Sequence, residues 1–342
     1  MKVNIYDLTL EGLGEALSSV PAFRAKQIYK WLYMGASPSE MTNIPKDLRT
    51  RLTEEFYTEL PKIDTKLVSK MDGTVKYLFR MEDGAGIESV VMPYRHGNTI
   101  CVSSQAGCRM GCAFCASTID GLDRNLTSGE MIGQLLAAEK DLGTKISHIV
   151  IMGSGEPLDN YDNVLTFIRN AIHPEGLGLS ARHITLSTCG ILKGMQKLAE
   201  EKLPINLAIS LHAPNDAIRK TLMPIAKSVS IDELLSESRA YFEKTHRRVT
   251  FEYALIRGVN DSAACAEELA RRIGKSGAFH VNLIPVNSIE ERTFRRSSRE
   301  VAATFSNILE KAGVQVTVRR KLGADIDAAC GQLRRAKKGK SL

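Results

Sequence analysis

The chain contains the stretch Cys108-Arg-Met-Gly-Cys112-Ala-Phe-Cys115, which places three thiols within eight residues. Thiols this crowded are typical of a site for a soft metal. Zinc normally takes four ligands, and no second Cys-x-x-Cys or His-x-x-x-His pair follows. Three cysteines instead suit a [4Fe–4S] cluster in which one iron stays open to another ligand. Burial of the three in an apolar core is disfavoured, because Gly107 and Gly111 make the segment a loop.

Short apolar, β-branched segments recur before and after this loop at intervals of roughly one βα unit. The clearest helix between them begins at Thr127, which can form a capping box with Glu130, and ends at Gly143. The alternation predicts an α/β fold with a parallel sheet, as an open or partial barrel or as a doubly wound sheet. In either fold we expect the chemistry at the carboxyl ends of the strands. The predicted strands are Thr99–Ser103, Ile146–Met152, His183–Ser187, Ile205–Leu211, Val249–Leu255, His280–Pro285 and Val314–Arg319.

The sequence predicts four regions along its 342 residues. Residues 1–60 form a small helical domain, because apolar residues recur at helical spacing in Phe23–Leu32 and again from Leu48 to Phe56. Residues 61–97 form an antiparallel extension with strands at Thr74–Met81 and Gly86–Pro93, which turn signals separate. Residues 98–333 form the main domain, and residues 334–342 are a basic tail.

Composition narrows the class of protein further. With 43% hydrophobic and 25% charged residues, the chain is a globular protein rather than a disordered or fibrous one. We expect no membrane span and no signal peptide, and therefore a cytoplasmic protein. Seven cysteines, an odd number, favour metal or redox chemistry over a framework of disulfides. A net charge of +7 favours an anionic partner without identifying it.

The spacing Cys-x-x-x-Cys-x-x-Cys, with Phe114 before the last cysteine, resembles the radical S-adenosylmethionine (SAM) superfamily. Further motifs resemble the RlmN family of RNA adenine C2-methyltransferases within it. This resemblance runs from about Glu88 to Leu333 and implies a partial (β/α)6 barrel, one [4Fe–4S] cluster held by Cys108, Cys112 and Cys115, and SAM as cofactor. The motifs are Cys101-Val-Ser-Ser-Gln-Ala-Gly-Cys108, Gly155-Glu156-Pro157-Leu158, Leu211-His212-Ala213-Pro214-Asn215, Leu222-Met223-Pro224-Ile225 and Asp325-Ile326-Asp327-Ala328-Ala329-Cys330-Gly331-Gln332-Leu333.

The resemblance also implies a set of residues that contact SAM. Each follows the carboxyl end of a predicted strand, which is where a barrel places its site. Taken alone, Gly155-Glu156-Pro157 is better explained as a turn, His212 as a buried core histidine, and Ser187 or Asn287 as local capping residues. Their common edge favours the site. The implied contacts are Gly155, Glu156, Ser187, Ser210, Leu211, His212 and Asn287.

Three further residues match the chemical steps of the family. Cys330 matches the cysteine that becomes S-methylated, and Cys101 matches the thiol that later releases the product and leaves a Cys101–Cys330 disulfide. Glu88 matches the proton acceptor, although by itself it would be interpreted as a solvent-facing strand residue. Cys189 and Cys265 match no role, and we expect both to be structural or inert.

The family's substrates are an adenosine near the peptidyl-transferase centre of 23S rRNA and, in many members, the adenosine just 3′ of a tRNA anticodon. The resemblance therefore implies both RNAs as partners, together with an external electron donor and a reductant for the disulfide. We expect a monomer. Basic clusters in the C-terminal half are candidate phosphate contacts, although each is as well explained as a solvated face. They are Arg247-Arg248, Arg292, Arg295-Arg296, Arg299 and Arg319-Arg320-Lys321.

One departure and three alternatives accompany the resemblance. The family usually has Met where this chain has Ser154, and we expect looser packing around SAM or the target base as a result. The first alternative is a Cfr-like enzyme, which methylates C8 of the same rRNA adenine and confers antibiotic resistance. The second is a non-enzymatic, zinc-bound RNA-binding module. The third, a radical SAM enzyme for a small molecule, is less favoured, because it leaves the pair Cys101 and Cys330 without a role.

Overall fold

The computed structural model describes residues 2–275, 277–286, 292–320, 322–326 and 328. Within them the α-helices are α1 (Leu10–Ala16), α2 (Ala22–Tyr33), α3 (Lys46–Glu55), α4 (Ser128–Leu142), α5 (Tyr161–Ile172), α6 (Leu192–Glu200), α7 (Asp216–Leu222), α8 (Ile231–Thr245), α9 (Ala263–Ile273) and α10 (Arg299–Lys311). The strands are β1 (Val3–Asn4), β2 (Phe56–Tyr57), β3 (Lys62–Val68), β4 (Val75–Arg80), β5 (Gly86–Tyr94), β6 (Gly97–Cys101), β7 (Gln105–Gly107), β8 (Leu122–Asn125), β9 (Ile146–Ile151), β10 (Ile184–Thr188), β11 (Asn206–Ser210), β12 (Val249–Leu255), β13 (Phe279–Pro285) and β14 (Gln315–Val318).

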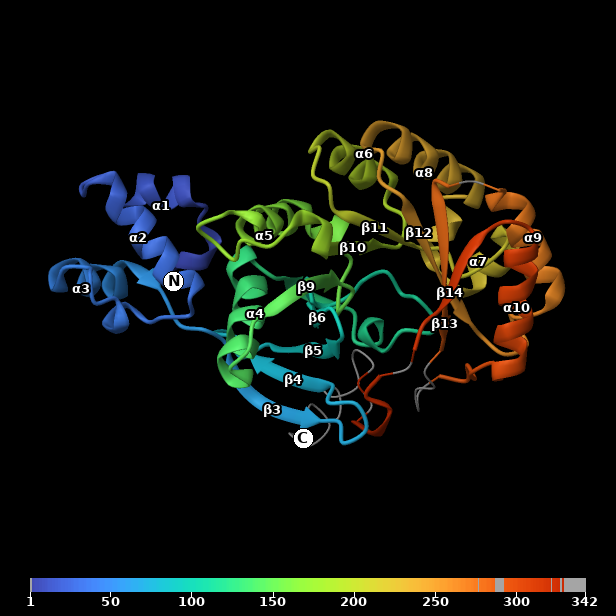
Figure 1. Ribbon diagram of the computed structural model, residues 1–342, viewed down its shortest axis with the longest axis horizontal. Coiled ribbons are helices and arrows are strands. Elements are labelled where there is room, and N and C mark those ends of the chain that lie inside the picture. The colour runs from blue at the N-terminus through green and yellow to red at the C-terminus, as the bar shows by residue number, and fades with distance from the viewer. Residues whose placement is uncertain (1, 276, 287–291, 321, 327, 329–342) are drawn as a thin grey trace.

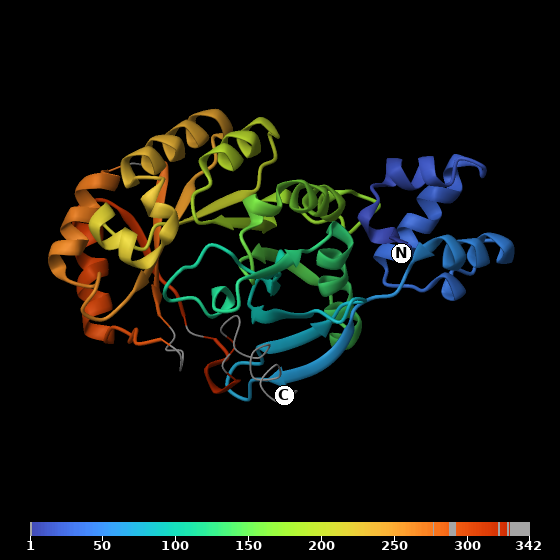
Figure 2. The ribbon, with the colours of Figure 1, turned by 180° about the vertical axis from the view of Figure 1, so that it is seen from behind.

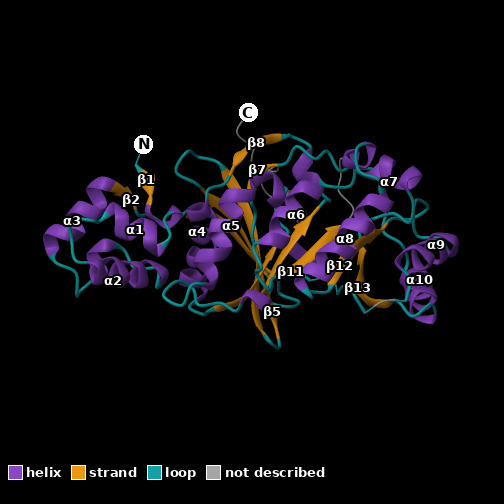
Figure 3. Ribbon diagram, turned by 90° about the horizontal axis from the view of Figure 1, so that it is seen from above, coloured by secondary structure: helices purple, strands orange, loops and turns teal. Residues whose placement is uncertain are grey.

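Most of the strands belong to one curved sheet, in the order β14-β13-β12-β11-β10-β9-β6-β5-β4-β3. The strands from β6 through β9 to β14 are parallel, and β3, β4, β5 and β6 are antiparallel neighbours. Helices α4, α5, α6, α8, α9 and α10 lie along the outer side of the arc (Figures 1 and 3). The sheet does not close, because β14 and β3 are its two edges.

This topology decides between the two architectures that the sequence left open. From β6 to β14 the spatial order of the parallel strands follows the chain without reversal. A doubly wound sheet reverses its order at a switch point, so that alternative is wrong. Six βα units followed by a seventh strand form the predicted partial barrel. Each predicted parallel strand is present, with ends within two residues of the expectation.

Helix α4 is specified locally, as its sequence predicts. The Thr127 hydroxyl accepts a hydrogen bond from the Glu130 amide at 3.2 Å, and the Glu130 carboxylate accepts one from the Thr127 amide at 2.9 Å. Gly143 ends the helix with φ 64°, in the left-handed region that favours glycine. The helix begins where the chain leaves the cysteine loop, so the capping box fixes the direction in which the chain returns to the sheet.

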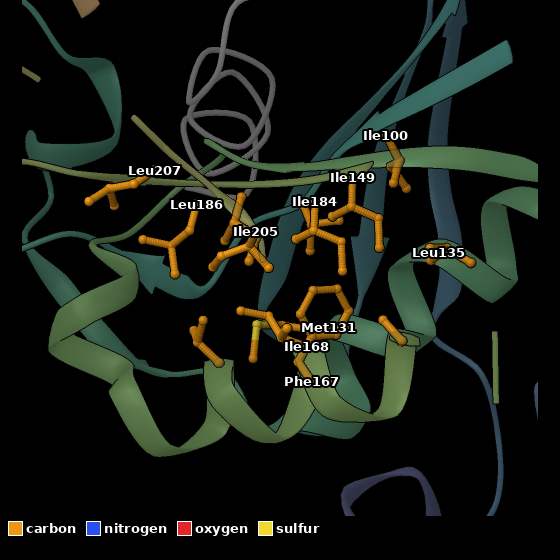
Figure 4. Packing of buried hydrophobic residues seen from close by; sticks show 14 of the residues in the cluster. Ile100, Met131, Leu135, Ile149, Phe167, Ile168, Ile184, Leu186, Ile205 and Leu207 are labelled. Atoms are coloured by element: carbon orange, nitrogen blue, oxygen red, sulfur yellow. The ribbon is translucent and has the colours of Figure 1, made fainter. Parts of the chain in front are cut away.

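The core lies between the sheet and its outer helices. Phe167 and Ile168 of α5 and Met131 of α4 pack under the side chains of the central strands (Figure 4). All of these residues are almost fully buried. The strand side chains that face them are Ile100, Ile149, Ile184, Leu186, Ile205 and Leu207. Because the outer face of each parallel strand is used for this packing, the inner face is left for the polar residues of the site.

The N-terminal helices α1, α2 and α3 form a separate group beside the barrel (Figure 2). Tyr29 of α2 donates a hydrogen bond to Asn170 of α5 at 3.1 Å, and Asn170 donates to the Leu8 carbonyl at 3.2 Å. The Gly129 amide at the start of α4 donates to Asp7 at 2.6 Å. These contacts join the group to the barrel side that carries α4 and α5. No helix in the described part of the chain is both long and apolar enough to cross a membrane.

The antiparallel extension agrees with its predicted strands and adds one. β4 and β5 match the expected segments, but the sequence pattern missed β3. Its residues are mostly exposed or half-buried, because β3 is an edge strand. An edge strand lacks the regular alternation of buried and exposed residues by which strands are found.

We expect Thr127→Ala to lower the free energy of unfolding by about 1 kcal/mol, because the first turn of α4 loses the hydroxyl that caps it. Urea denaturation followed by circular dichroism measures the change. Thr166→Ala on the exposed side of α5 is the matched control, since that hydroxyl bonds only the Asp162 carbonyl of its own helix. Equal stability of the two variants would contradict the role of the capping box.

Candidate active site

A cavity of about 410 Å³ lies on the inner side of the arc and reaches the carboxyl ends of the parallel strands. It brings together predicted residues from distant parts of the chain. Glu88 comes from β5, Cys101 ends β6, and Ser187 and Ser210 lie near or at the ends of β10 and β11. The cavity also contains, from the predicted set, Cys108, Cys112, Cys115, Gly155, Glu156 and His212.

Three predicted residues do not appear in this lining. Leu211 is buried, and its amide donates to the Glu252 carbonyl at 3.1 Å. Asn287 and Cys330 lie outside the described residues. Ala328, two residues before Cys330 in the sequence, does line the cavity.

The cysteine loop is held at its start and in its middle by backbone contacts. Cys108 donates its amide hydrogen to the Gly121 carbonyl at 2.8 Å, and Gly107 has φ 83°. A Cβ at Gly107 would lie 2.1 Å from the Gly121 oxygen, so only glycine fits this crossing. In the middle of the loop, Ala113 donates to the Leu222 carbonyl at 2.8 Å. The Leu222-Met223-Pro224 motif therefore supports the cysteine loop from α7.

The three thiols of this loop share one apolar environment. Burial, together with the neighbouring Cys115 and the carboxylates of Glu156 and Asp159, raises the pKa of Cys108 to about 11. Burial also raises the pKa of Cys112 and of Cys115, and each of the other two thiols adds to the shift at Cys112. Thiolates in this position need positive charge beside them, and a metal centre supplies it.

A single metal ion and an iron–sulfur cluster need their thiolate ligands at different distances from one another. No group of three or more His, Cys, Asp or Glu side chains in the described ranges is placed to hold a metal ion. Two thiolates on one tetrahedral zinc lie about 4 Å apart. In a [4Fe–4S] cluster each thiolate binds a different iron, so the ligands stand farther apart. The three thiols come from one loop and line one cavity, a donor set that fits a cluster with three thiolate ligands.

Ser154 ties the end of β9 to this loop. Its hydroxyl donates to the Gly107 carbonyl at 3.2 Å, and its amide donates to the Ser103 hydroxyl at 2.9 Å. Its carbonyl accepts from the amides of Ser104 and Gln105. Where the family usually has Met, this chain thus has a small hydroxyl that is buried and hydrogen-bonded, and looser packing around SAM or the target base stays a prediction.

Glu156 is a buried carboxylate at the start of the turn after β9. Its two oxygens accept from the amides of Leu158 at 3.1 Å and Cys189 at 2.7 Å. Burial raises its pKa, and these hydrogen bonds oppose the shift. No lysine or arginine in the described part of the chain forms an ion pair with it. A cationic ligand such as the ammonium group of SAM would provide the missing charge.

Gly155 allows the chain to pass close to the strand that precedes the cysteines. Its φ is 114°, and a Cβ would lie 2.7 Å from the side chains of Gln105 and Ser104. The Gln105 side chain accepts from the Glu156 amide at 2.8 Å. Gln105 thus links the turn after β9 to the segment that leads into the cysteine loop.

His212 is neutral, and its hydrogen bond fixes its tautomer. Burial, together with the nearby Arg219, lowers its pKa to about 3. Its Nδ1 lies 2.9 Å from the Ala254 amide, which can only donate, so Nε2 carries the proton. The ring packs edge-on against Phe114 of the cysteine loop at 4.8 Å. His212 therefore offers one N–H donor beside the cysteine loop.

Glu88 and Cys101 occupy the side of the cavity that the antiparallel strands build. Lys76 Nζ lies 3.0 Å from Glu88 Oε2, and the two side chains are only 1% and 3% exposed. The interpretation of Glu88 as a solvent-facing residue is thus wrong, because its side chain is buried at the cavity and paired with Lys76 of β4. Burial raises the pKa of Cys101 to about 11, whereas Arg319 acts to lower it.

Sequence reasoning missed several charged groups around this cavity. Lys76 and Glu252 come from segments interpreted as ordinary strands, and burial raises the pKa of Glu252 to about 7. Arg219 is fully buried and donates to the carbonyls of Cys189 and Ser210. Cys189, expected to be inert, lines the cavity. For Lys76 and Glu252 the sequence did offer a signal, namely a charged residue inside an apolar strand pattern.

The fold and the cavity define a class, that of radical SAM enzymes. The model of the radical SAM superfamily matches residues 102–273. A crystal structure of a radical SAM methyltransferase from Sphaerobacter thermophilus superposes with a TM-score of 0.92 at 44% identity, covering 96% of this chain and 98% of that one.

The family follows from the N-terminal helices and from the full-length relatives. Residues 3–58 match the family model of the ribosomal RNA large subunit methyltransferase N-terminal domain. A probable dual-specificity RNA methyltransferase RlmN from Clostridium tetani is 55% identical over 97% of this chain and 96% of its own. A relative of the same name from Clostridium novyi is 53% identical over 97% and 98%. The chain belongs to the RlmN family of radical SAM methyltransferases, a membership that implies a [4Fe–4S] cluster and SAM.

We expect Cys112→Ser to lose most of the iron that wild-type protein takes up on anaerobic reconstitution, about four atoms per chain. Iron analysis and the visible absorption of the brown protein measure the loss. Cys265→Ser is the matched control, because this thiol lies on α9 outside the cavity. Full iron content in the Cys112 variant would exclude that thiol as a ligand.

We expect Lys76→Met to lower the free energy of unfolding by about 3–5 kcal/mol, because it leaves the Glu88 carboxylate buried without its cation. The double variant Lys76→Met/Glu88→Gln should recover part of this loss. Lys66→Met, which removes the half-exposed pair with Asp141, should cost less than about 1 kcal/mol. Chemical denaturation measures all three, and equal losses for Lys76 and Lys66 would argue against a buried pair.

Proposed function

We propose that this protein methylates carbon C2 of one adenosine near the peptidyl-transferase centre of 23S rRNA, and of the adenosine just 3′ of the anticodon in tRNAs. The observation that carries the proposal is the single cavity shared by the cysteine loop, Cys101 and the segment that leads to Cys330. The relatives named dual-specificity RNA methyltransferases support the two kinds of RNA. Because its proposed substrates are rRNA and tRNA, we expect this protein in the cytoplasm.

The target atom explains why the site is built from thiols rather than from a simple methyl-transfer pocket. C2 of adenine lies between two ring nitrogens and is too electron-poor to attack the methyl group of SAM. When bound, the cluster supplies the electron that cleaves SAM to a 5′-deoxyadenosyl radical, which can remove a hydrogen atom from an S-methyl group. We assign Cys108, Cys112 and Cys115 as the ligands of this cluster.

Cys330 is the carrier of the methyl group in this proposal. Its thiolate is a good nucleophile and takes the methyl group of one SAM. The S-methyl group loses a hydrogen atom to the 5′-deoxyadenosyl radical, and its carbon then bonds to C2, which joins the RNA to the enzyme. The resulting radical gives up one electron, for which the oxidised cluster would be the acceptor, and C2 loses its proton. Cys101 resolves this adduct: its sulfur forms a bond with the Cys330 sulfur, the bond from that sulfur to the methylene carbon breaks, and the carbon takes up a proton. A disulfide remains, so the next cycle needs an external reductant as well as an electron donor.

Glu88 accepts the proton that leaves C2. Lys76 Nζ lies 3.0 Å from Glu88 Oε2, so the ion pair holds the carboxylate in position within the buried side of the cavity. The Glu88 carbonyl also accepts a hydrogen bond from Ser103 at 2.7 Å, so the strand that carries Glu88 is tied to the end of β6. These contacts keep the base beside Cys101 and away from bulk water.

We assign the SAM contacts to the turn after β9 and to the ends of the next strands. Glu156 binds the ammonium group, for which its buried charge is suited. His212 Nε2 donates to an acceptor of SAM, and Ser187 and Ser210 offer hydroxyls from neighbouring strands. Leu211 and Asn287 complete the set by resemblance alone.

RNA binding requires the target base to leave its stack and enter the cavity, which costs a few kcal/mol and costs least in loops. Positive charge is available where the base would enter, because Arg319 and Arg320 line the cavity. Phosphate contacts by these side chains would hold the flanking nucleotides. We propose that one protein monomer acts on each RNA.

We expect RNA incubated anaerobically with methyl-labelled SAM, a reductant and wild-type protein to yield labelled 2-methyladenosine. Cys330→Ala should give no labelled RNA, because the carrier is missing. Cys101→Ala should accumulate a covalent protein–RNA adduct, because nothing resolves it. Mass spectrometry of the hydrolysed RNA and gel analysis of the protein measure both outcomes.

Cys265→Ser is the control and should match wild type. Labelled 8-methyladenosine in place of the 2-methyl isomer would support a Cfr-like activity instead. Labelled 2-methyladenosine from the Cys330→Ala variant would overturn the route through a methylated cysteine.

A further inference from the structure

The segment Leu322–Ala328 is attached to the β3–β4 turn, although about 250 residues separate the two in the chain. Ser69 donates its hydroxyl hydrogen to Asp325 Oδ1 at 2.6 Å, and the Lys70 amide donates to Asp325 Oδ2 at 2.9 Å. From the other side, the Gly323 amide donates to Asp72 Oδ2 at 2.8 Å. We call this set of three hydrogen bonds the clasp. Figure 1 shows the C-terminal segment beside the β3–β4 turn.

Each half of the clasp is folded by its own contacts. In the turn, the Ser69 hydroxyl accepts from the amides of Met71 and Asp72, and the Thr74 carbonyl accepts from the Ser69 amide. In the segment, the Gly323 carbonyl accepts from the amides of Ile326 and Ala328. The two carboxylates are thus presented by a preformed turn and a preformed bend, which lowers the entropy cost of joining them.

The contact between the halves is close as well as polar. Gly323 has φ 60°, and a Cβ there would lie 2.5 Å from the Ala328 Cβ and 3.1 Å from Thr74 Cγ2. Ser69 and Thr74 are buried. The hydrogen bond from Ser69 holds the pKa of Asp325 below its ordinary value, so Asp325 is ionised at neutral pH and its bonds are charge-assisted.

The clasp lies where the sheet is open. β14 and β3 are the two edges of the sheet, and the chain leaves β14 immediately before this segment. By reaching the β3–β4 turn, the segment links the two edges across the cavity. Thr74, Leu322 and Ala328 line the cavity together with Cys101. The clasp therefore determines where the chain toward Cys330 enters the site.

We propose that Ser69, Asp72 and Asp325 are positioning residues that hold the Cys330 segment over the cavity, so that its thiol meets SAM and Cys101 in turn. Cys330 is only two residues from Ala328, and two residues span at most about 7 Å. Anchoring Ala328 therefore keeps Cys330 within this radius of a residue that lines the cavity. This inference rests on the role proposed for Cys330, and none of the three residues touches the reacting atoms.

The test measures how often Cys330 meets Cys101, without requiring turnover. Reconstituted wild-type, Asp325→Ala and Asp72→Ala proteins are equilibrated anaerobically with mixtures of reduced and oxidised glutathione. Mass spectrometry of the peptides then measures the fraction with a Cys101–Cys330 disulfide. We expect the effective concentration of the two thiols to fall about tenfold or more in each variant, because each loses one or two hydrogen bonds of the clasp. Asp325→Asn keeps an acceptor for Ser69, so its effective concentration should lie between those of wild type and Asp325→Ala.

Asp83→Ala is the matched control. It lies in the neighbouring β4–β5 turn and accepts from the Ala85 amide and from Arg124, away from the clasp. This variant should keep the wild-type effective concentration. SAM cleavage to 5′-deoxyadenosine by the reduced cluster should stay within about twofold of wild type in all variants, since neither the cluster ligands nor the predicted SAM contacts change.

Unchanged disulfide equilibria in Asp325→Ala and Asp72→Ala would overturn the proposal, as would an equal loss in Asp83→Ala. Loss of SAM cleavage in step with loss of the disulfide would assign these residues a general structural role instead. Failure of the proposed function has a different signature. In that case wild-type protein itself forms no Cys101–Cys330 disulfide, or Cys330→Ala still methylates RNA.

Discussion

Burial of ionisable groups inside an incomplete barrel is the constraint on which this structure depends. The cavity holds three thiols of one loop and the carboxylate of Glu156, and no lysine or arginine among the described residues forms an ion pair with Glu156. Such groups are costly in an apolar setting unless a ligand brings opposite charge. In the proposed function, a metal cluster at the thiols and the ammonium group of SAM at Glu156 bring that charge. The free-energy cost of burying these groups without a ligand therefore indicates the kind of charge that a ligand of this cavity brings.

The buried carboxylates on the two sides of the cavity have different partners. On the side of the parallel strands, Glu156 forms no ion pair with a described lysine or arginine and accepts hydrogen bonds from the amides of Leu158 and Cys189. On the side of the antiparallel strands, Glu88 already has its cation in Lys76. This difference suits the two tasks that we propose, in which Glu156 meets the external charge of SAM and Glu88 accepts a proton from the substrate.

Glycine and small polar residues connect these two sides. Gly107 and Gly155 allow backbones to pass closer than a Cβ would permit. Ser154 and Ser103 then join the ends of β9, β6 and β5 through side-chain hydrogen bonds. The open edge of the sheet is bridged in a similar way, because Asp72 and Asp325 reach backbone amides across it. Hydrogen bonds to the main chain therefore set the distances between strands that carry the reactive groups.

The sequence by itself determined the parallel strands, the cap of α4 and the cysteine loop, because these depend on local periodicity, on residues three apart, and on ligand spacing within eight residues. Its motifs also pointed to the family. Only the tertiary structure decided that the sheet is a partial barrel, that Glu88 is buried against Lys76, and that Ser69 meets Asp325. These facts depend on the order in which strands pair and on contacts between residues far apart in the chain. Local patterns do not record such pairings, since a lysine in a strand looks the same whether it faces water or a buried carboxylate.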